Sequence, residues 1–364
     1  MTDTRAEHDT SGSATGSGSG SGSGAADAER ARALAALQGL AIGDALGMPT
    51  QSMSLAEIRR DHGVIDDFVD AGPHQRIAHG MPAASVTDDT EQAVLVAELL
   101  IAGDGRIDPV RFAEALIEWE RTMAAKGSLD LLGPSTKTAV ERILDGVPAD
   151  QAGSTGTTNG AAMRITPVGI ATAVGDHPAG LEALVDAVQD ASRVTHDTGI
   201  GIAGAAAVAA AVSAGIAGAD RQGALDVAVA AARIGEGRGH WIAGGSIADR
   251  TAWARQHLRS VPAAERIDVV SGLIGTSVAS QESVVAALAL VALDLDPWQT
   301  CCSAASIGGD TDTIAAMAGA VLGAVHGPDA WPAAAVERVE AVNDLRLSEL
   351  TDRLLDLRRR ATPA

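Results

Sequence analysis

The sequence has 364 residues, of which 47 are acidic and 27 basic, giving a formal charge of −20 and a pI near 4.7. This balance argues against a nucleic-acid binder that relies on a basic face. Hydrophobic residues make up 46% of the chain, but it contains only 2 Phe, 5 Trp and no Tyr. We therefore expect helices that pack closely through Ala, Val, Leu, Ile and Gly.

The N-terminal segment is acidic and then rich in Ser and Gly, without the basic and apolar regions of a signal peptide. We expect residues 1–28 to form a disordered tail. Near the other end of the chain, Cys301 and Cys302 are adjacent, which suits neither a disulfide framework nor a zinc site. Two buried reduced thiols in a cytoplasmic protein are the expected arrangement.

Apolar residues at helical spacing begin near Glu29 and predict the first helix. Further helices are predicted at about 91–102, 109–124, 134–146, 180–192, 199–215, 222–234, 281–293 and 313–326. Loops rich in Gly, Ser, Thr, Asn and Pro are expected at 72–86, 147–160 and 235–246. Apolar and polar residues rarely alternate with the period of two that is typical of strands. The sequence therefore predicts one compact all-α domain over residues 29–360.

Two of the predicted helices consist largely of small residues. The segment Gly199 to Gly218 has 20 uncharged residues, enough to cross a bilayer, but Ala and Gly gain little from lipid. We expect a buried helix there. In the helix at 313–326, Ala315, Gly319 and Gly323 recur every four residues, with Gly327 next in the series. This spacing predicts a smooth stripe on which a second helix could lie close.

Two short clusters carry consecutive hydroxyl and carboxylate groups, at residues 87–90 (TDDT) and 310–313 (DTDT). Either could be a helix N-cap, and Asp88 with Glu91 has the spacing of a capping box. Together they supply more oxygen atoms than capping requires, and clustered carboxylates repel unless a cation lies between them. Mg²⁺ and Mn²⁺ prefer such ligands. If the helix starts converge, they could hold two metals that fix sugar hydroxyls and activate a water.

Five motifs extend this interpretation. They are residues 39–49 (GLAIGDALGMP), 87–90 (TDDT), 159–164 (NGAAMR), 195–196 (TH) and 308–313 (GGDTDT). From about residue 33 to 328 the chain resembles the ADP-ribosylglycohydrolases, of the kind that includes the dinitrogenase-reductase-activating glycohydrolase. The segment 132–137 (LGPSTK) is similar to a bacterial branch with a poorly defined physiological substrate.

The resemblance implies an orthogonal helical bundle that binds two Mg²⁺ or Mn²⁺ ions. The implied reaction is hydrolysis at the anomeric carbon of an ADP-ribosyl group on a protein or small molecule. The implied metal ligands are Thr87, Asp88, Asp89, Asp310, Asp312 and Thr313. Asp312 would bridge the two ions, and Asp89 or Asp312 would receive the proton of the attacking water.

Substrate contacts are implied for Gly43, Asp44, Gln51, Asn159, Gly160, His196, Gly308 and Gly309. The loop ending in Asn159 and Gly160 would wrap the diphosphate with backbone amides. His196 would lie near the same phosphates, although a histidine satisfied by its neighbours is the alternative. Asp44 would hold loop amides beside the metals.

Two positions depart from the family pattern. Gln51 stands where the family usually has a Glu credited with a catalytic or gating role, and an amide cannot shuttle a proton at neutral pH. Leu131 stands where many relatives have an acidic residue, with Asp130 one position earlier. We therefore expect a preference for leaving groups that need little protonation. Two alternatives remain: hydrolysis of another ribosylated nucleotide or nucleoside, and ADP-ribose binding without turnover.

Several other residues allow more than one interpretation. Trp241, near Arg238 and His240, is expected in the core, with adenine stacking as the alternative. Arg164 could pair with a phosphate or with a buried Asp. Glu282 is expected as an acid in the first turn of a helix. Nothing in the sequence predicts membrane association or an oligomeric state.

Overall fold

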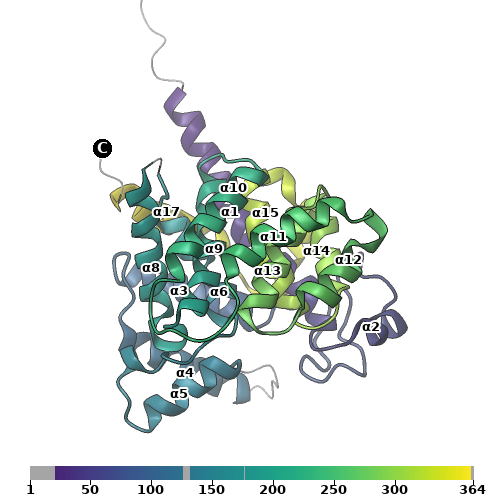
Figure 1. Cartoon of the computed structure of the whole chain (residues 1–364), viewed down its shortest axis with the longest axis horizontal. Helices are drawn as coiled ribbons and strands as arrows, with labels where there is room; N and C mark the ends of the chain where they lie inside the picture. The colour runs from purple at the N-terminus through teal and green to yellow at the C-terminus, as the bar shows by residue number, and fades with distance from the viewer. Residues whose placement is uncertain (1–20, 126–131, 176, 362–364) are drawn as a thin grey trace, which may run out of the picture.

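A computed structural model describes residues 21–125, 132–175 and 177–361 (Figure 1). Within this part of the chain the secondary structure is helical, with isolated β-bridges and no strand. The predicted all-α fold is therefore confirmed. The α-helices are α1 (Ser21–Gly47), α2 (Leu55–Asp61), α3 (Asp88–Ala102), α4 (Pro109–Ala125), α5 (Pro134–Leu144), α6 (Gly160–Met163), α7 (Thr166–Ala171), α8 (Pro178–His196), α9 (Gly199–Ile216), α10 (Arg221–Gly235), α11 (Ile247–Ser260), α12 (Arg266–Val269), α13 (Ser280–Val291), α14 (Pro297–Ala305), α15 (Thr311–His326), α16 (Ala333–Asn343) and α17 (Leu347–Ala361).

Each predicted helix is present, with ends that differ by a few residues. The largest difference is at the start of α1, which begins at Ser21, so the expectation that residues 21–28 belong to the tail is wrong. The rest of the predicted tail lies outside the described residues. The prediction also missed α2, α6, α7, α11, α12, α14, α16 and α17.

Helix α9 forms the centre of the bundle, against α6, α7, α8, α10, α13 and α15. All of its residues are buried, although by length and composition it could span a membrane. Ala and Gly let the surrounding helices approach it closely, which explains how a core with few aromatic residues is filled. The prediction of a buried helix is confirmed.

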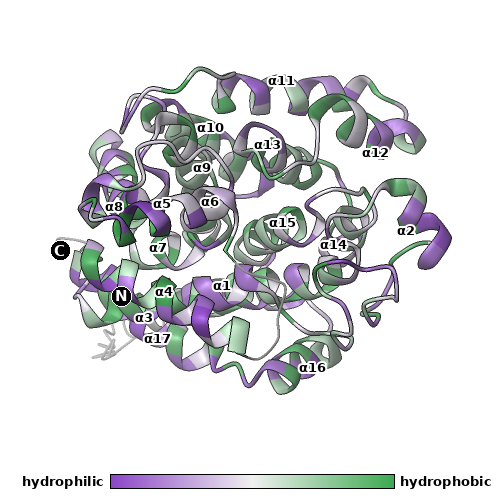
Figure 2. Cartoon of the chain, turned by 90° about the horizontal axis from the view of Figure 1, so that it is seen from below, coloured by the Kyte–Doolittle hydropathy of each residue, from purple (hydrophilic) through white to green (hydrophobic). Residues whose placement is uncertain are grey.

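Helices α1 and α15 lie against each other in opposite directions, with α15 near the middle of the view in Figure 2. A Cβ atom built on Gly43 would lie 2.1 Å from the carbonyl oxygen of Ala315, and one on Gly319 would lie 2.1 Å from that of Gly39. These positions exclude any side chain. The predicted stripe on α15 is therefore a helix-packing surface, and α1 is the helix that covers it.

Candidate active site

The two acidic clusters meet at the starts of α3 and α15. Thr313 donates a hydrogen bond of 3.2 Å from Oγ1 to Oδ2 of Asp89. The side chains of Asp89 and Asp312 are both buried. The contact between α1 and α15 continues to this point, since a Cβ on Gly47 would lie 2.4 Å from the Cα of Asp312.

Helix capping accounts for a small part of these clusters. Thr87 caps α3, because its hydroxyl accepts a hydrogen bond from the backbone amide of Asp89. Asp88 is the first residue of α3 and not its N-cap, so a capping box with Glu91 does not form. The Asp88 carboxylate accepts a hydrogen bond from Nε2 of Gln92 instead. Asp310 occupies the N-cap position of α15 without a capping hydrogen bond from its side chain. Another role is needed for the carboxylates.

Asp44, on α1, organises the cluster at residues 87–90. It accepts hydrogen bonds from the backbone amides of Thr87 and Thr90, at 3.0 and 3.1 Å, and from both hydroxyls, at 2.8 and 2.5 Å. Burial raises the pKa of Asp44 to about 6, although these hydrogen bonds favour the charged form. Asp44 therefore positions α3 from behind and does not line the neighbouring cavity.

The carboxylates lie close enough to affect one another. Burial, and then the charge of Asp312, holds the pKa of Asp89 well above its usual range, with smaller contributions from Asp44, Asp88 and Asp310. Burial also raises the pKa of Asp310 to about 6. Oδ1 of Asp89 is buried and accepts no hydrogen bond from any described residue. A cation would relieve both the repulsion and this unsatisfied oxygen atom.

The donor set suits a hard divalent ion, because it consists of carboxylates and hydroxyls. Within the described part of the chain, however, no three Asp, Glu, His or Cys side chains by themselves form a metal-binding group. A cation would therefore also need the hydroxyls of Thr87 and Thr313, water molecules, and rotation of the carboxylates. The residues fit Mg²⁺ or Mn²⁺ by charge and ligand type.

A cavity of about 270 Å³ opens beside the acidic cluster. Polar groups line one part of it and a few apolar side chains complete the wall. Its lining comprises Gln51, Ser52, Ile77, Asp88, Leu132, Gly133, Pro134, Thr136, Thr158, Asn159, Gly160, Met163, Val278, Asp310, Asp312 and Thr313. The structure thus brings four of the predicted metal ligands and three of the predicted substrate contacts to one cavity.

The loop before α6 is tied to the acidic cluster. Nδ2 of Asn159 donates hydrogen bonds to Oδ2 of Asp310, at 2.5 Å, and to Oγ of Ser283, at 2.9 Å. Gly160 follows, and a Cβ atom there would lie 3.0 Å from Cε1 of His196. This close approach leaves little room for a larger residue at Gly160.

His196 lies behind this loop and does not line the cavity. Its Nε2 is 3.0 Å from Oγ1 of Thr158, and its Nδ1 is 2.7 Å from Oγ1 of Thr195. Burial, followed by the charge of Arg164, lowers the pKa of His196 well below its usual value, so the ring is neutral. It contacts the cavity through Thr158.

Three predicted glycines support the site from outside the cavity. Gly43 belongs to the contact between α1 and α15 described above. Gly308 and Gly309 have left-handed φ values of 82° and 80°. Gly309 exchanges backbone hydrogen bonds with Ser52 and Met53, at 2.7 and 2.9 Å, which fixes the segment carrying Gln51 beside the start of α15.

Gln51 lines the cavity with its side chain 5% exposed. Its Nε2 donates no hydrogen bond to any described residue. Gln75 fixes the backbone at this position by donating from Nε2 to the carbonyl oxygen of Gln51, at 3.0 Å. The structure therefore places an amide with an unused donor in the wall of the cavity. Leu131 and Asp130, the other departure from the family pattern, lie outside the described residues.

The remaining candidates lie away from the cavity. Trp241 is 83% exposed, so the expectation that it is a core residue is wrong: the loop after α10 carries it over the surface. Arg164 is buried and donates to Oε1 of Gln92 and Oγ1 of Thr195, not to a carboxylate. Burial lowers its pKa to about 10. Glu282 does lie in the first turn of α13, as expected.

Some residues of the site escaped the sequence analysis. Thr158 lines the cavity, and Ser283 holds Asn159 from α13. Gln92 links Asp88 to the buried guanidinium of Arg164. For two of them, the place in the sequence could have indicated a role in the site: Thr158 directly precedes Asn159, and Gln92 lies one helical turn after Asp88. Nothing in the sequence distinguished Ser283.

Comparison with known proteins gives a consistent result. A sequence model of the family described as ADP-ribosylglycohydrolase matches residues 25–364. A relative from Escherichia coli K12, named "Uncharacterized protein YegU", is 34% identical over 86% of this chain and 92% of its own length. An "ADP-ribosylarginine hydrolase Tri1" from Pseudomonas putida is 28% identical over 84% of this chain and 74% of its own length.

An "ADP-ribosyl-[dinitrogen reductase] glycohydrolase" from Rhodospirillum rubrum is 29% identical over 45% of this chain and 51% of its own length. A solved structure titled "ADP-ribosylglycohydrolase-related protein complex" has a TM-score of 0.62 and 24% identity. It covers 92% of this chain and 100% of its own. At this identity the structural match supports the fold alone.

Proposed function

Because the chain belongs to the ADP-ribosylglycohydrolase family of hydrolases, we propose that it cleaves the glycosidic bond at the anomeric carbon of an ADP-ribosylated protein. The cavity beside the starts of α3 and α15 would be its active site. The observation that carries this assignment is the buried carboxylate of Asp89, held among four other aspartates with one oxygen atom unsatisfied. A helix N-terminus needs one capping oxygen atom and does not require a cluster of buried carboxylates.

Two divalent ions, Mg²⁺ or Mn²⁺, would be held by Asp88, Asp89, Asp310 and Asp312, with the hydroxyls of Thr87 and Thr313. When bound, they would supply Lewis acidity and positive charge beside the anomeric carbon. Asp44 would keep the segment 87–90 in place through its four hydrogen bonds. Asn159 would do the same for Asp310.

The reaction adds a water molecule at the anomeric carbon and breaks the bond to the leaving group, which takes up a proton. Asp89, buried directly behind the cavity wall, is one candidate to accept the proton of the attacking water. Asp312, on the cavity wall, is the second candidate. The diphosphate would lie against the backbone of residues 158–160, with Thr158 positioned by His196.

Gln51 bears on the choice of leaving group. As a neutral amide it can donate a hydrogen bond to the substrate but cannot protonate a departing oxygen atom. A guanidinium-linked ADP-ribose carries its own positive charge and can leave as a neutral guanidine, so it needs little acid assistance. We therefore propose arginine-linked ADP-ribose as the favoured substrate, in line with the relatives named ADP-ribosylarginine hydrolase.

A substrate panel tests this proposal. ADP-ribose release would be measured from arginine-, serine- and carboxylate-linked substrates and from simple nucleosides, with Mg²⁺ or Mn²⁺ and with a chelator. We expect metal-dependent release, fastest from the arginine linkage, followed by the carboxylate linkage. Equal or faster cleavage of the serine linkage would refute the role of Gln51. Cleavage of nucleosides alone would favour the alternative substrate class, and binding of ADP-ribose without turnover of any substrate would refute the hydrolase.

A further inference from the structure

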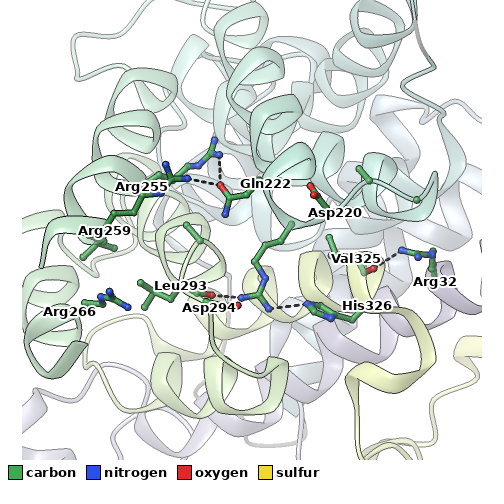
Figure 3. Close-up of a pocket in the computed structure, with 15 residues that line it drawn as sticks. Arg32, Asp220, Gln222, Arg255, Arg259, Arg266, Leu293, Asp294, Val325 and His326 are labelled. Atoms are coloured by element: carbon green, nitrogen blue, oxygen red, sulfur yellow. Dashed lines mark hydrogen bonds between the residues drawn. The ribbon is translucent and has the colours of Figure 1, made fainter. Parts of the chain in front are cut away.

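A second and larger cavity, of about 800 Å³, lies where α9, α13 and α15 end (Figure 3). It shares no lining residue with the cavity beside the acidic cluster. Five arginines line it, although the chain as a whole carries a charge of −20. They are Arg32, Arg221, Arg255, Arg259 and Arg266.

Two of these arginines have a structural role. Arg32 donates to the carbonyl oxygens of Gly215, Ala324 and Val325, which are at the ends of α9 and α15. Arg221 donates to the carbonyl oxygens of Leu293 and Leu295, after α13. Their positive charges satisfy carbonyl groups that helix ends leave open and offset the negative ends of the helix dipoles.

Arg266 shares part of this role, because its Nε donates to the carbonyl oxygen of Val261, just after α11, at 3.1 Å. Arg255 and Arg259 donate to no backbone carbonyl oxygen of the described residues. Arg255 and Arg259, on α11, both donate to Oε1 of Gln222, at 3.0 and 2.9 Å. Figure 3 shows these two guanidinium-bearing side chains on the same side of the cavity, with Arg266 below them. In the described part of the chain neither Arg259 nor Arg266 has a carboxylate within 4.0 Å.

Arg255 adds an independent sign of a missing partner. Its side chain is 10% exposed and pairs through one terminal nitrogen with Asp226, at 2.9 Å. Its Nε is buried and donates no hydrogen bond to any described residue. A buried, unsatisfied donor on a charged group is costly unless a ligand or water accepts from it. Sharing one amide oxygen also brings the guanidinium groups of Arg255 and Arg259 together, and Asp226 pairs with Arg255 but not with Arg259.

We propose that this cavity binds a small phosphorylated sugar, with its phosphate against Arg255, Arg259 and Arg266. The planar guanidinium group donates paired hydrogen bonds that match the oxygen atoms of a phosphate. Asp294 lies on the side of the cavity opposite Gln222, where its charge would repel a second phosphate and accept hydrogen bonds from hydroxyl groups. The cavity volume is within the range of sites for ligands of this size.

The site would be separate from substrate hydrolysis. Helix α15 carries Asp312 in its first turn and ends at His326, which lines the arginine cavity. At about 1.5 Å per residue, its 16 residues place the two ends about 24 Å apart. A ligand at one end therefore cannot overlap a substrate at the other.

Calorimetric titration of the full chain with ribose 5-phosphate, inorganic phosphate and ribose tests the proposal. We expect saturable binding of ribose 5-phosphate, weaker binding of inorganic phosphate and no binding of ribose. The double variant Arg259→Gln/Arg266→Gln should weaken ribose 5-phosphate binding at least tenfold. Both side chains reach the surface, so this variant should fold, as circular dichroism would show.

Arg233→Gln is the matched control, because Arg233 is 60% exposed on α10, pairs with Asp249 and lies outside the cavity. It should bind ribose 5-phosphate like the wild type. Pyrophosphate, titrated in the same way, should bind the wild type more weakly than ribose 5-phosphate. In Asp294→Asn the ratio of the two dissociation constants should be smaller. Absence of saturable binding up to about 10 mM ligand would overturn the proposal. So would binding that the double variant leaves unchanged, since the ligand would then lie elsewhere.

Discussion

Thr313 donates a hydrogen bond from Oγ1 to Oδ2 of Asp89 across 224 residues of chain, and so joins the first turn of α15 to the first turn of α3. Neither cluster has a complete set of ligands alone. The proposed catalytic centre exists only when the two helices are held together, and the contact between α1 and α15 contributes to that.

The first prediction concerns turnover. Asp312→Asn removes a carboxylate from the cavity wall with little change in shape, so ADP-ribose release should fall by about 100-fold or more, which is several kcal/mol of lost transition-state stabilisation. Asp329→Asn makes the same exchange at an exposed position just after α15 and should leave turnover unchanged. Near wild-type activity of Asp312→Asn would remove this residue from the mechanism.

The second prediction concerns metal binding without a measurement of activity. Asp89→Asn relieves repulsion among the buried aspartates, so without metal the variant should melt at a higher temperature than the wild type. Adding Mn²⁺ should raise the melting temperature of the wild type, by an amount equivalent to about 2.7 kcal/mol at 100 times the dissociation constant. The variant should respond much less. An equal response of the two proteins would place the metal elsewhere.

The third prediction concerns Gln51. Gln51→Glu restores a group that can exchange a proton beside the cavity, so serine-linked ADP-ribose should gain more in kcat/KM than the arginine-linked substrate. We expect a relative gain of about tenfold or more. Gln256→Glu, at an exposed position on α11, is the control for the added charge. If both substrates change by the same factor, Gln51 does not set the linkage preference.

The fourth prediction concerns the contact between α1 and α15. Gly43→Ala places a Cβ atom 2.1 Å from a carbonyl oxygen, so the helices must separate, and unfolding free energy should fall by about 1–3 kcal/mol. Gly24→Ala makes the same exchange in α1 with no atom nearby and should change stability by less than about 1 kcal/mol. Denaturant titration of both variants gives the comparison. Equal effects would mean that the close contact is not essential.

The fifth prediction concerns the two thiols, which are unbonded and buried on α14, as the sequence suggested. Burial raises the pKa of Cys302 to about 12 and that of Cys301 further. At pH 8 almost no thiolate is present in the folded protein, so thiol reagents should react slowly and should modify both residues after unfolding. Rapid modification of the native protein would contradict the raised pKa of these thiols.

The sequence allowed the helical class and many of the long helices to be predicted from the spacing of their apolar residues. The helices α11 and α17 were missed although they have 14 and 15 residues. Helices α2 and α7 are too short to show that spacing, and α1 begins in a segment of Ser, Gly and Ala that resembles a tail. Helices in such segments are stabilised by tertiary packing and capping, which cannot be inferred from local composition.

The convergence of residues 87–90 and 310–313 was also predictable, because excess carboxylates need a shared partner. The supporting contacts were not. Gly43 resembles a substrate contact in the sequence and proves to be a packing residue, since its role depends on which helix lies opposite. The cavity lined by Arg255, Arg259 and Arg266 could not be predicted either, because its other residues come from distant parts of the chain.

The contact between α1 and α15 is made by backbone atoms at Gly39, Gly43 and Gly319. The spacing of these helices therefore does not depend on the size of any side chain. The aliphatic residues around α9 can change in size without adding an atom to this backbone contact. For this protein, redesign for thermal tolerance should begin there and leave the glycine contact untouched.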